Sequence, residues 1–216
     1  MGLLKQLGKE YKKKGNLIIH ERTKSSCKII KPNKDVFYII GFLADGCLPK
    51  RKWKYEIEIY QKDLKLLKKI AKMFKKNFEL KPKISSHKNI SRLRVCSKPL
   101  YFYLKELHKE VLENLEKKKL RRHFISGFLD AEGSLIKTKK GLRVSITQSD
   151  IDVLKKISKV LGEYNIHSKV YGPYMHRNSK KPMFYLHVEG KHVSKFFKKI
   201  PSLRFFSVPH TMTLLR

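Results

Sequence analysis

The sequence contains little cysteine and no long apolar run. Its three cysteines, Cys27, Cys47 and Cys96, are odd in number and show no CxxC spacing, which argues against a disulfide framework and a structural zinc site. No stretch approaches the roughly 18 apolar residues that span a bilayer, and the N-terminal residues lack the apolar core of a signal peptide. We therefore expect a soluble, intracellular protein without a membrane partner, either cytoplasmic in a prokaryote or organellar.

Acidic residues are also scarce, with 18 Asp and Glu against 51 Lys and Arg and a formal net charge of +33. A monomer with this charge repels itself unless a polyanion neutralises it, so nucleic acid is the leading partner. The chain is 41% hydrophobic and 11% aromatic, which excludes a disordered basic tail. Abundant lysine beside little glutamine favours a hot habitat.

The second half of the chain repeats the first. At an offset of 87 residues, DLKLLKKI (Asp63–Ile70) aligns with DIDVLKKI (Asp150–Ile157), and Gln61 aligns with Gln148. These are two of only three glutamines in the chain. Further along the chain, KPLYFYLKEL (Lys98–Leu107) resembles KHVSKFFKKI (Lys191–Ile200) at an offset of 93 residues. An internal duplication therefore organises the 216 residues into two repeats.

Each repeat shows the same order of hydrophobic periods, α-β-β-α-β-β-α. We expect a basic extension over 1–34, repeats over 35–112 and 123–216, and a linker over 113–122. Glycine after each apolar helix predicts a left-handed C-terminal cap. In the first repeat the predicted helices are Phe37–Ala44, Lys62–Lys76 and Pro99–Leu107, with a strand over Tyr55–Tyr60 and a hairpin over Leu80–Cys96. In the second repeat the predicted helices are Phe124–Ala131, Asp150–Leu161 and His192–Ile200, with a strand over Leu142–Thr147 and a hairpin over Ile166–Val188.

An acidic residue ends each apolar helix, Asp45 in the first repeat and Glu132 in the second. An acid there faces the negative end of the helix dipole, at a cost of up to about 1 kcal/mol unless a cation is present. A single acid followed by glycine more often marks an ordinary helix end. An acid at the equivalent position of both repeats favours a functional role. If the two helices pack side by side, the paired carboxylates suit Mg²⁺ beside phosphate.

The two motifs resemble those of a known family. FYIIGFLADGCL (Phe37–Leu48) and FISGFLDAEGSL (Phe124–Leu135), within the doubled element order, resemble the LAGLIDADG homing endonucleases in their single-chain, two-motif form. The resemblance covers about residues 35–203. The first motif departs from the pattern, because Gly41 lies four residues before its acid whereas Gly127 lies five before its own.

The resemblance implies an α+β fold of two pseudo-symmetric repeats, whose four-stranded antiparallel sheets form a saddle in the DNA major groove. It implies a monomeric endonuclease that cuts both strands of a long, partly asymmetric double-stranded DNA target and leaves 3′ overhangs. Mg²⁺ is the implied cofactor, with Mn²⁺ as a substitute and Ca²⁺ as an ion that binds without supporting cleavage.

The resemblance also implies roles for single residues. The family surrounds its metal-binding acids with a glutamine that orients water and a lysine that holds charge, although a solvated surface is an equal alternative for lysines in a chain this rich in them. The implied residues are the metal ligands Asp45 and Glu132, with the backbone of Gly46 and Gly133 as further candidates, and the catalytic neighbours Gln61, Gln148, Lys98 and Lys191.

DNA contacts are expected on strand residues that face away from the helices. Arginine suits guanine edges and lysine suits phosphates. The candidates are Lys50, Arg51, Lys52, Trp53, Lys54, Glu56, Glu58, Lys81, Lys83, Ser85, His87, Asn89, Arg92 and Arg94 in the first repeat, and Lys137, Lys139, Lys140, Arg143, Ser145, Thr147, Lys169, Tyr171, Tyr174, His176, Arg177 and Lys180 in the second.

Two other functions stay open. The shortened first motif motivates a LAGLIDADG-type RNA maturase that binds its own intron RNA, or a regulator that binds DNA without cutting. A ribosomal protein would explain the charge but not the paired acids. The sequence does not reveal the target, or whether the gene lies in an intron or an intein, although an intron is favoured.

Overall fold

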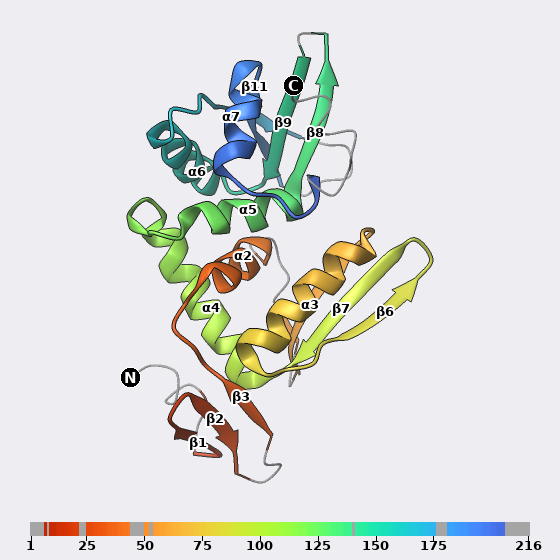
Figure 1. Ribbon diagram of the computed structural model, residues 1–216, viewed down its shortest axis with the longest axis vertical. Coiled ribbons are helices and arrows are strands. Elements are labelled where there is room, and N and C mark those ends of the chain that lie inside the picture. Colours follow the sequence, from red (N-terminus) through yellow and green to blue (C-terminus); the bar gives the residue numbers. More distant parts are fainter. Residues whose placement is uncertain are drawn as a thin grey trace. The chain divides into compact units, whose positions relative to one another are not determined.

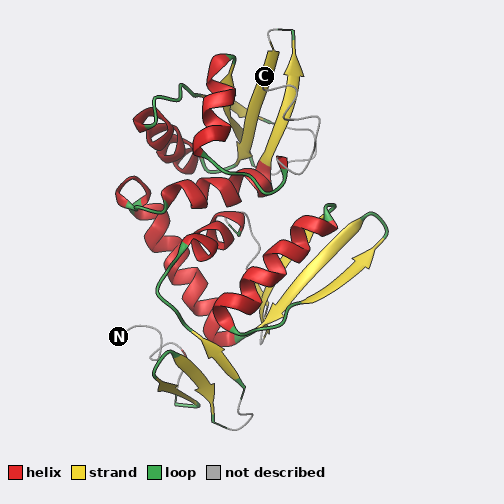
Figure 2. Ribbon diagram, in the orientation of Figure 1, coloured by secondary structure: helices red, strands yellow, loops and turns green. Residues whose placement is uncertain are grey.

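The computed structural model describes residues 7, 9–21, 25–43, 50–51, 54–139, 141–175 and 181–205. The chain forms two compact units, residues 1–110 and 111–216, and each contains one repeat. Within the described ranges the strands form three antiparallel sheets, and helices and strands alternate as the sequence predicts (Figures 1 and 2). Every helix in these ranges is too short or too polar to span a lipid bilayer.

The first unit contains a sheet in the order β4-β5-β7-β6. Helix α3 packs against β5 and β7 and buries one face of this sheet (Figure 1). Ile57, Ile59 and Leu93 on that face and Ile70 on the helix are all 0% exposed. The elements are α2 (Lys34–Phe42), β4 (Lys50–Arg51), β5 (Lys54–Gln61), α3 (Leu64–Phe78), β6 (Lys83–His87), β7 (Ile90–Cys96) and α4 (Lys98–Glu113).

The second unit repeats this arrangement with a sheet in the order β10-β11-β9-β8. Helices α6 and α7 pack on it, and Val144, Ile146, Leu186 and Val188 are 0% exposed. The elements are the 3₁₀ helix η1 (Leu115–Lys117), α5 (Arg121–Glu132), β8 (Gly133–Thr138), β9 (Gly141–Gln148), α6 (Ile151–Glu163), β10 (Lys169–Tyr174), β11 (Met183–Glu189) and α7 (Lys191–Lys199).

The described part of the basic extension is folded. It contains β1 (Tyr11–Lys14), β2 (Leu17–His20) and β3 (Ser26–Lys28), which pair in that order as an antiparallel sheet. Ile18 and Cys27 pair across β2 and β3, and each is 2% exposed. Burial raises the pKa of the Cys27 thiol to about 12, so this thiol stays protonated at neutral pH. We call these three strands the N-terminal sheet.

The predicted linker over 113–122 is structured, because side chains tie it to α6. Leu115 is 1% exposed, Lys156 Nζ donates to the carbonyl of Leu112 at 2.9 Å, and Lys159 pairs with Glu116 at 2.6 Å. The polar composition of residues 113–122 did not indicate that Leu115 is buried or that this segment contacts α6.

Gly133 is not the left-handed cap that the sequence predicts. Its φ of −87° and ψ of 155° are extended backbone, and it is the first residue of β8 directly after α5. A Cβ at this position would lie 2.3 Å from the carbonyl oxygen of Leu129. Glycine is therefore required by the close approach of the backbone to the last turn of α5. Gly46, the equivalent predicted cap, lies outside the described residues.

We predict that Gly133→Ala lowers the free energy of unfolding by at least about 2 kcal/mol, because the new methyl group collides with backbone that cannot yield. Gly162→Ala in α6 is the matched control, since a Cβ there meets nothing within 4 Å, and it should stabilise by about 0.5–1 kcal/mol. Urea denaturation measures both. Equal changes in the two variants would contradict the steric explanation.

Candidate functional site

In the second unit, the acid of the motif and its predicted glutamine lie at the same end of the sheet. Glu132 ends α5 and Gln148 ends β9. Gly133 pairs with Ile146, so the residue next to the acid lies two positions from Gln148 along the strand. Gln148 is 5% exposed, and its Oε1 accepts from the Ser149 amide at 2.6 Å. The fold therefore holds this glutamine in one orientation beside the end of α5.

Lys191 lies toward the other end of the same sheet. It follows β11, whose last residue, Glu189, pairs with Arg143 near the start of β9. Arg143 is five residues before Gln148, which is roughly 17 Å along a strand. The structure therefore does not bring Lys191 to Gln148, because β11 runs away from the end where Glu132 lies.

Lys98 in the first unit has the same placement. Cys96, at the end of β7, pairs with Glu56 near the start of β5, whereas Gln61 at the end of β5 pairs with Ser91. Lys98 thus lies at the opposite end of the sheet from Gln61. The match between repeats located both lysines along the chain, but it carried no information about strand direction.

Asp130, which the sequence reasoning left unassigned, is a buried carboxylate in the last turn of α5. It is 0% exposed. Its Oδ1 accepts from Ser202 Oγ at 2.5 Å, and its Oδ2 accepts from the backbone amides of Leu203 at 2.7 Å and Arg204 at 3.3 Å. The segment 202–204, which we call the C-terminal strap, is thereby fixed across the end of α5. A charged residue inside the apolar stretch FLDAE was the available sequence signal.

Arg204 places a positive charge at the end of α5. Its Nη1 donates to the carbonyl oxygens of Asp130 at 3.3 Å and Gly133 at 3.0 Å, on either side of Glu132 in the chain. These carbonyls belong to the negative end of the helix dipole, where a cation is stabilising. Arg204 therefore supplies the cation that an acid at this position requires.

The described residues of the second unit do not form a complete metal cage. Among the described residues, no three His, Cys, Asp or Glu side chains gather as a cation site. Glu132 is partly exposed and offers hard carboxylate oxygens, whereas the Gly133 carbonyl already accepts from Arg204. A divalent ion at Glu132 therefore needs further oxygens from elsewhere, and the second motif acid, Asp45, lies outside the described residues.

The outer face of the first unit's sheet, turned away from α3, carries arginines held by glutamates. Arg92 Nη1 donates to Glu58 Oε1 at 3.4 Å, and the Tyr60 hydroxyl donates to Glu58 Oε2 at 3.1 Å. Arg94 lies 3.7 Å from Glu56. Glu58 is 3% exposed and Glu56 is 8% exposed. Each carboxylate cancels one positive charge and orients one guanidinium, which favours recognition of base edges over phosphates.

The outer face of the second unit is chemically different. Arg143 pairs with Glu189 at 2.5 Å, and the rings of Tyr171 and His187 lie 4.9 Å apart. Burial, with the nearby charge of Arg143, lowers the pKa of His187, so this imidazole is neutral at pH 7. Tyr185 shares this face, since it pairs with Thr147 across the strands.

Tyr60, Tyr185 and His187 were absent from the sequence-predicted contacts. They alternate along their strands with buried residues such as Ile59, Leu186 and Val188, and this period of two was the signal that could have found them.

One predicted contact faces the other way. Lys137 pairs with Leu142, which shares the face of buried Val144, so Lys137 lies on the helix side. Ile136 pairs with Arg143 and is 42% exposed on the outer face. The reason is that α5 passes directly into β8 without a loop, so the position of Gly133 determines which residues of β8 face the helices and which face outward.

The other predicted contacts divide into four groups. Lys81, Asn89 and Lys139 lie next to strands or in turns, and Lys83, Ser85, Ser145, Lys169 and Tyr174 lie in strands. Lys50, Arg51, Lys54 and His87 are placed in strands by their backbone alone. Lys52, Trp53, Lys140, His176, Arg177 and Lys180 lie outside the described residues.

We predict that Asp130→Asn destabilises the protein by about 2–3 kcal/mol, because the amide group presents N–H donors to the Leu203 and Arg204 amides and removes the buried charge. Asp152→Asn is the control, since that side chain is 75% exposed on α6 and should change stability by less than about 0.5 kcal/mol. Chemical denaturation measures the difference. Similar values for both variants would show that the C-terminal strap does not depend on the carboxylate.

The described geometry agrees with comparisons to known proteins. A LAGLIDADG-like domain matches residues 38–109 and 119–201. Homing endonuclease I-ApeI of Aeropyrum pernix is 26% identical over 156 residues, which cover 65% of this chain and 69% of that protein. An uncharacterized protein of Methanocaldococcus jannaschii is 28% identical over 158 residues, which cover 66% of this chain and 59% of that protein.

Solved structures show the same fold. I-DmoI in complex with DNA and Mn is similar with a TM-score of 0.63 and 27% identity, over 77% of this chain and 96% of that chain. A variant of I-DmoI in complex with its target DNA in the presence of Mg gives a TM-score of 0.61 and 27% identity, over 77% and 95%. The N-terminal LAGLIDADG domain of DUF199/WhiA, 14% identical with a TM-score of 0.58, shares the fold alone.

Proposed function

Since the chain belongs to the LAGLIDADG-like domain family, we propose that it is a divalent-metal-dependent endonuclease that makes a double-strand break in a specific DNA target. The similarity to I-ApeI and to I-DmoI in complex with DNA and Mn supports this activity. The observation that carries the proposal is the placement of Glu132 at the end of α5, beside Gln148 and braced by the C-terminal strap.

Each residue has a limited task in the proposed reaction. Glu132 in the second unit and Asp45 in the first would each hold a divalent ion, which would supply Lewis-acid stabilisation of the phosphate and an activated water. Gln148 and Gln61 orient water for attack on the phosphate. Lys98 and Lys191 are left out of this chemistry, because strand register places both at the far ends of their sheets.

The two outer faces support an asymmetric target. The first unit presents two arginines held by glutamates, and the second presents one such pair, Arg143 with Glu189, beside tyrosines, a neutral histidine and hydroxyl groups. Equivalent positions therefore meet different base edges. We propose a long target with unlike halves, cut to leave 3′ overhangs by a monomer that an intron encodes.

A non-cleaving protein that binds RNA or DNA is the second candidate. The observation that favours it is that α2 ends at Phe42, three residues before Asp45, whereas α5 continues to Glu132 itself. The two acids thus lie at different separations along the chain from the last residue of their helices. Tight binding of intron RNA, with no nicking of any DNA in the presence of Mg²⁺, would favour this candidate.

We predict that Glu132→Gln lowers the rate of double-strand cleavage by at least about 100-fold, because the amide keeps the shape but loses the charge that holds the ion. Binding of target DNA without divalent ions should stay within about twofold, since the lost charge repelled phosphate. A plasmid bearing a target selected from a cleavage library supplies the assay, with Asp152→Asn as the active control. Full double-strand cutting by Asp45→Asn combined with Glu132→Gln would refute the assignment.

We predict that Glu58→Gln strengthens binding to scrambled duplex by about 3- to 10-fold and lowers the ratio of target to scrambled affinity, because Arg92 is released to contact phosphates. Fluorescence anisotropy at fixed salt measures both affinities. Asp152→Asn removes one negative charge from an exposed helix and serves as the control. If the two variants change both affinities equally, Glu58 does not direct the arginine.

A further inference from the structure

Polar contacts from α4 and from the residue after α3 fasten the N-terminal sheet, and the chain on either side of it, to the rest of the first unit. Lys98 Nζ, at the start of α4, donates to the carbonyl of Leu7 at 3.0 Å. The Tyr103 hydroxyl donates to the carbonyl of Ile30 at 2.8 Å. Lys28 pairs with Glu79 after α3 at 2.9 Å. The N-terminal sheet therefore has a fixed position relative to the sheet of the first unit.

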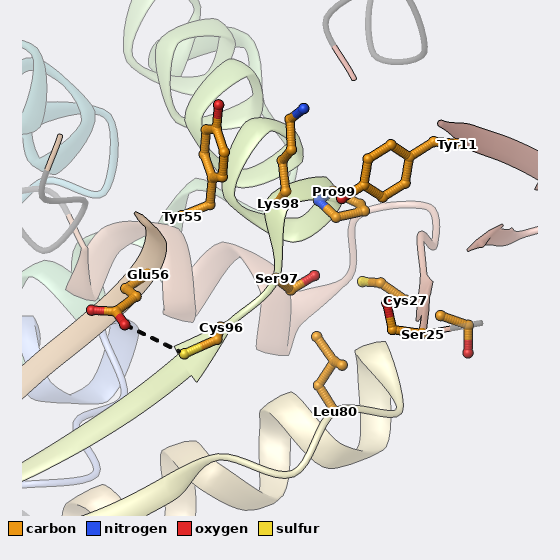
Figure 3. A pocket seen from close by; sticks show the side chains of 11 residues that line it. Tyr11, Ser25, Cys27, Tyr55, Glu56, Leu80, Cys96, Ser97, Lys98 and Pro99 are labelled. Carbon is orange, nitrogen blue, oxygen red and sulfur yellow. Dashed lines mark hydrogen bonds between the residues drawn. The ribbon is translucent and has the colours of Figure 1, made fainter. Parts of the chain in front are cut away.

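This position borders the outer face. Tyr11, Ser26 and Cys27 of the N-terminal sheet line one cavity of about 320 Å³ together with Glu56 and Cys96, which pair on the outer face near the start of β5 and the end of β7 (Figure 3). Figure 3 shows Lys98 between the rings of Tyr11 and Tyr55. Its Nζ lies 5.4 Å and 5.3 Å from their centroids. Lys98 thus joins the two sheets by cation–π contacts as well as by its hydrogen bond.

The N-terminal sheet is strongly basic along its free edge. Residues 1–34 contain ten Lys and Arg but two acids. β1 is an edge strand of sequence YKKK, and Lys12, Lys13 and Lys14 are all exposed. Lys12 pairs with Glu21 at 2.6 Å. Consecutive lysines on an edge strand discourage edge-to-edge aggregation, and beside a DNA-facing surface they can also bind phosphates.

We infer that the N-terminal sheet is a second DNA-contact surface of the first unit, on which Lys12, Lys13 and Lys14 hold backbone phosphates of the duplex that flanks the target. The inference rests on the proposed function, since it takes the outer face as the DNA-facing one. It follows that the protected DNA extends further past the first unit than the two four-stranded sheets alone require. The lysines add affinity without sequence preference, because phosphate contacts do not read bases.

The test compares two triple variants of the full chain that remove the same charge. In the first, Lys12, Lys13 and Lys14 are changed to Ala. In the matched control, Lys65, Lys68 and Lys72, exposed on α3 on the helix side of the sheet, are changed to Ala. A third variant with Arg at positions 12–14 keeps the charge. Urea denaturation of each variant verifies that the fold is retained.

Binding is measured without divalent ions, against salt concentration, on a target with long flanks and on targets trimmed at either flank. We expect the Lys12–Lys14 variant to lose about 2–3 from the slope of log K against log salt and roughly 10- to 100-fold in affinity near physiological salt. The control should lose less than about threefold. The Arg variant should match the parent, and trimming one flank should weaken the parent but not the Lys12–Lys14 variant.

Two results would overturn the inference: equal losses in the Lys12–Lys14 variant and the α3 control, or an unchanged parent affinity after trimming of either flank. Either result would show that Lys12, Lys13 and Lys14 make no specific contact with the flanking phosphates. Failure of the proposed function would look different, because the parent would then cut no target of any length while the flank dependence of its binding could still be read.

Discussion

The direct passage of α5 into β8 is the constraint on which the second unit depends. No residue separates the helix from the strand, so the Gly133 backbone must approach the Leu129 carbonyl more closely than any side chain allows. That junction sets which strand residues face the helices, and it leaves Glu132 at the end of the sheet where Gln148 also lies. It also places Glu132 beside the C-terminal carbonyl groups of α5, which form the negative end of the helix dipole. The guanidinium of Arg204 and the buried carboxylate of Asp130 then stabilise the junction from the outside.

The sequence predicted the parts whose physics is local. Helices α3 and α6 have apolar residues at helical spacing, and β5 and β9 alternate, so the duplicated order and the α+β fold were confirmed. The sequence did not place the N-terminal sheet, because its strands are only three or four residues long. The C-terminal strap escaped because Asp130 meets Ser202 across 72 residues of chain, which no local pattern records. The alignment of the two repeats likewise does not show the direction in which each strand runs, and it is this direction that separates Lys191 from Glu132.

Acids and bases are distributed by task in this protein. Most lysines are solvated, whereas the few acids on the outer face of the first unit are buried against arginines. Burying an unpaired carboxylate destabilises a protein. The arginines therefore stabilise the buried Glu56 and Glu58, and the two glutamates in turn orient the arginines.

The C-terminal strap also has a consequence for how the protein is made. Ser202 and Arg204 are synthesised about 70 residues after Asp130, so the end of α5 stays open until most of the second unit has left the ribosome. Until then a growing chain lacks both the guanidinium beside Glu132 and the donors that satisfy Asp130. The last turn of α5 is therefore completed only late in synthesis, and truncation before residue 204 removes every contact that the C-terminal strap makes with it.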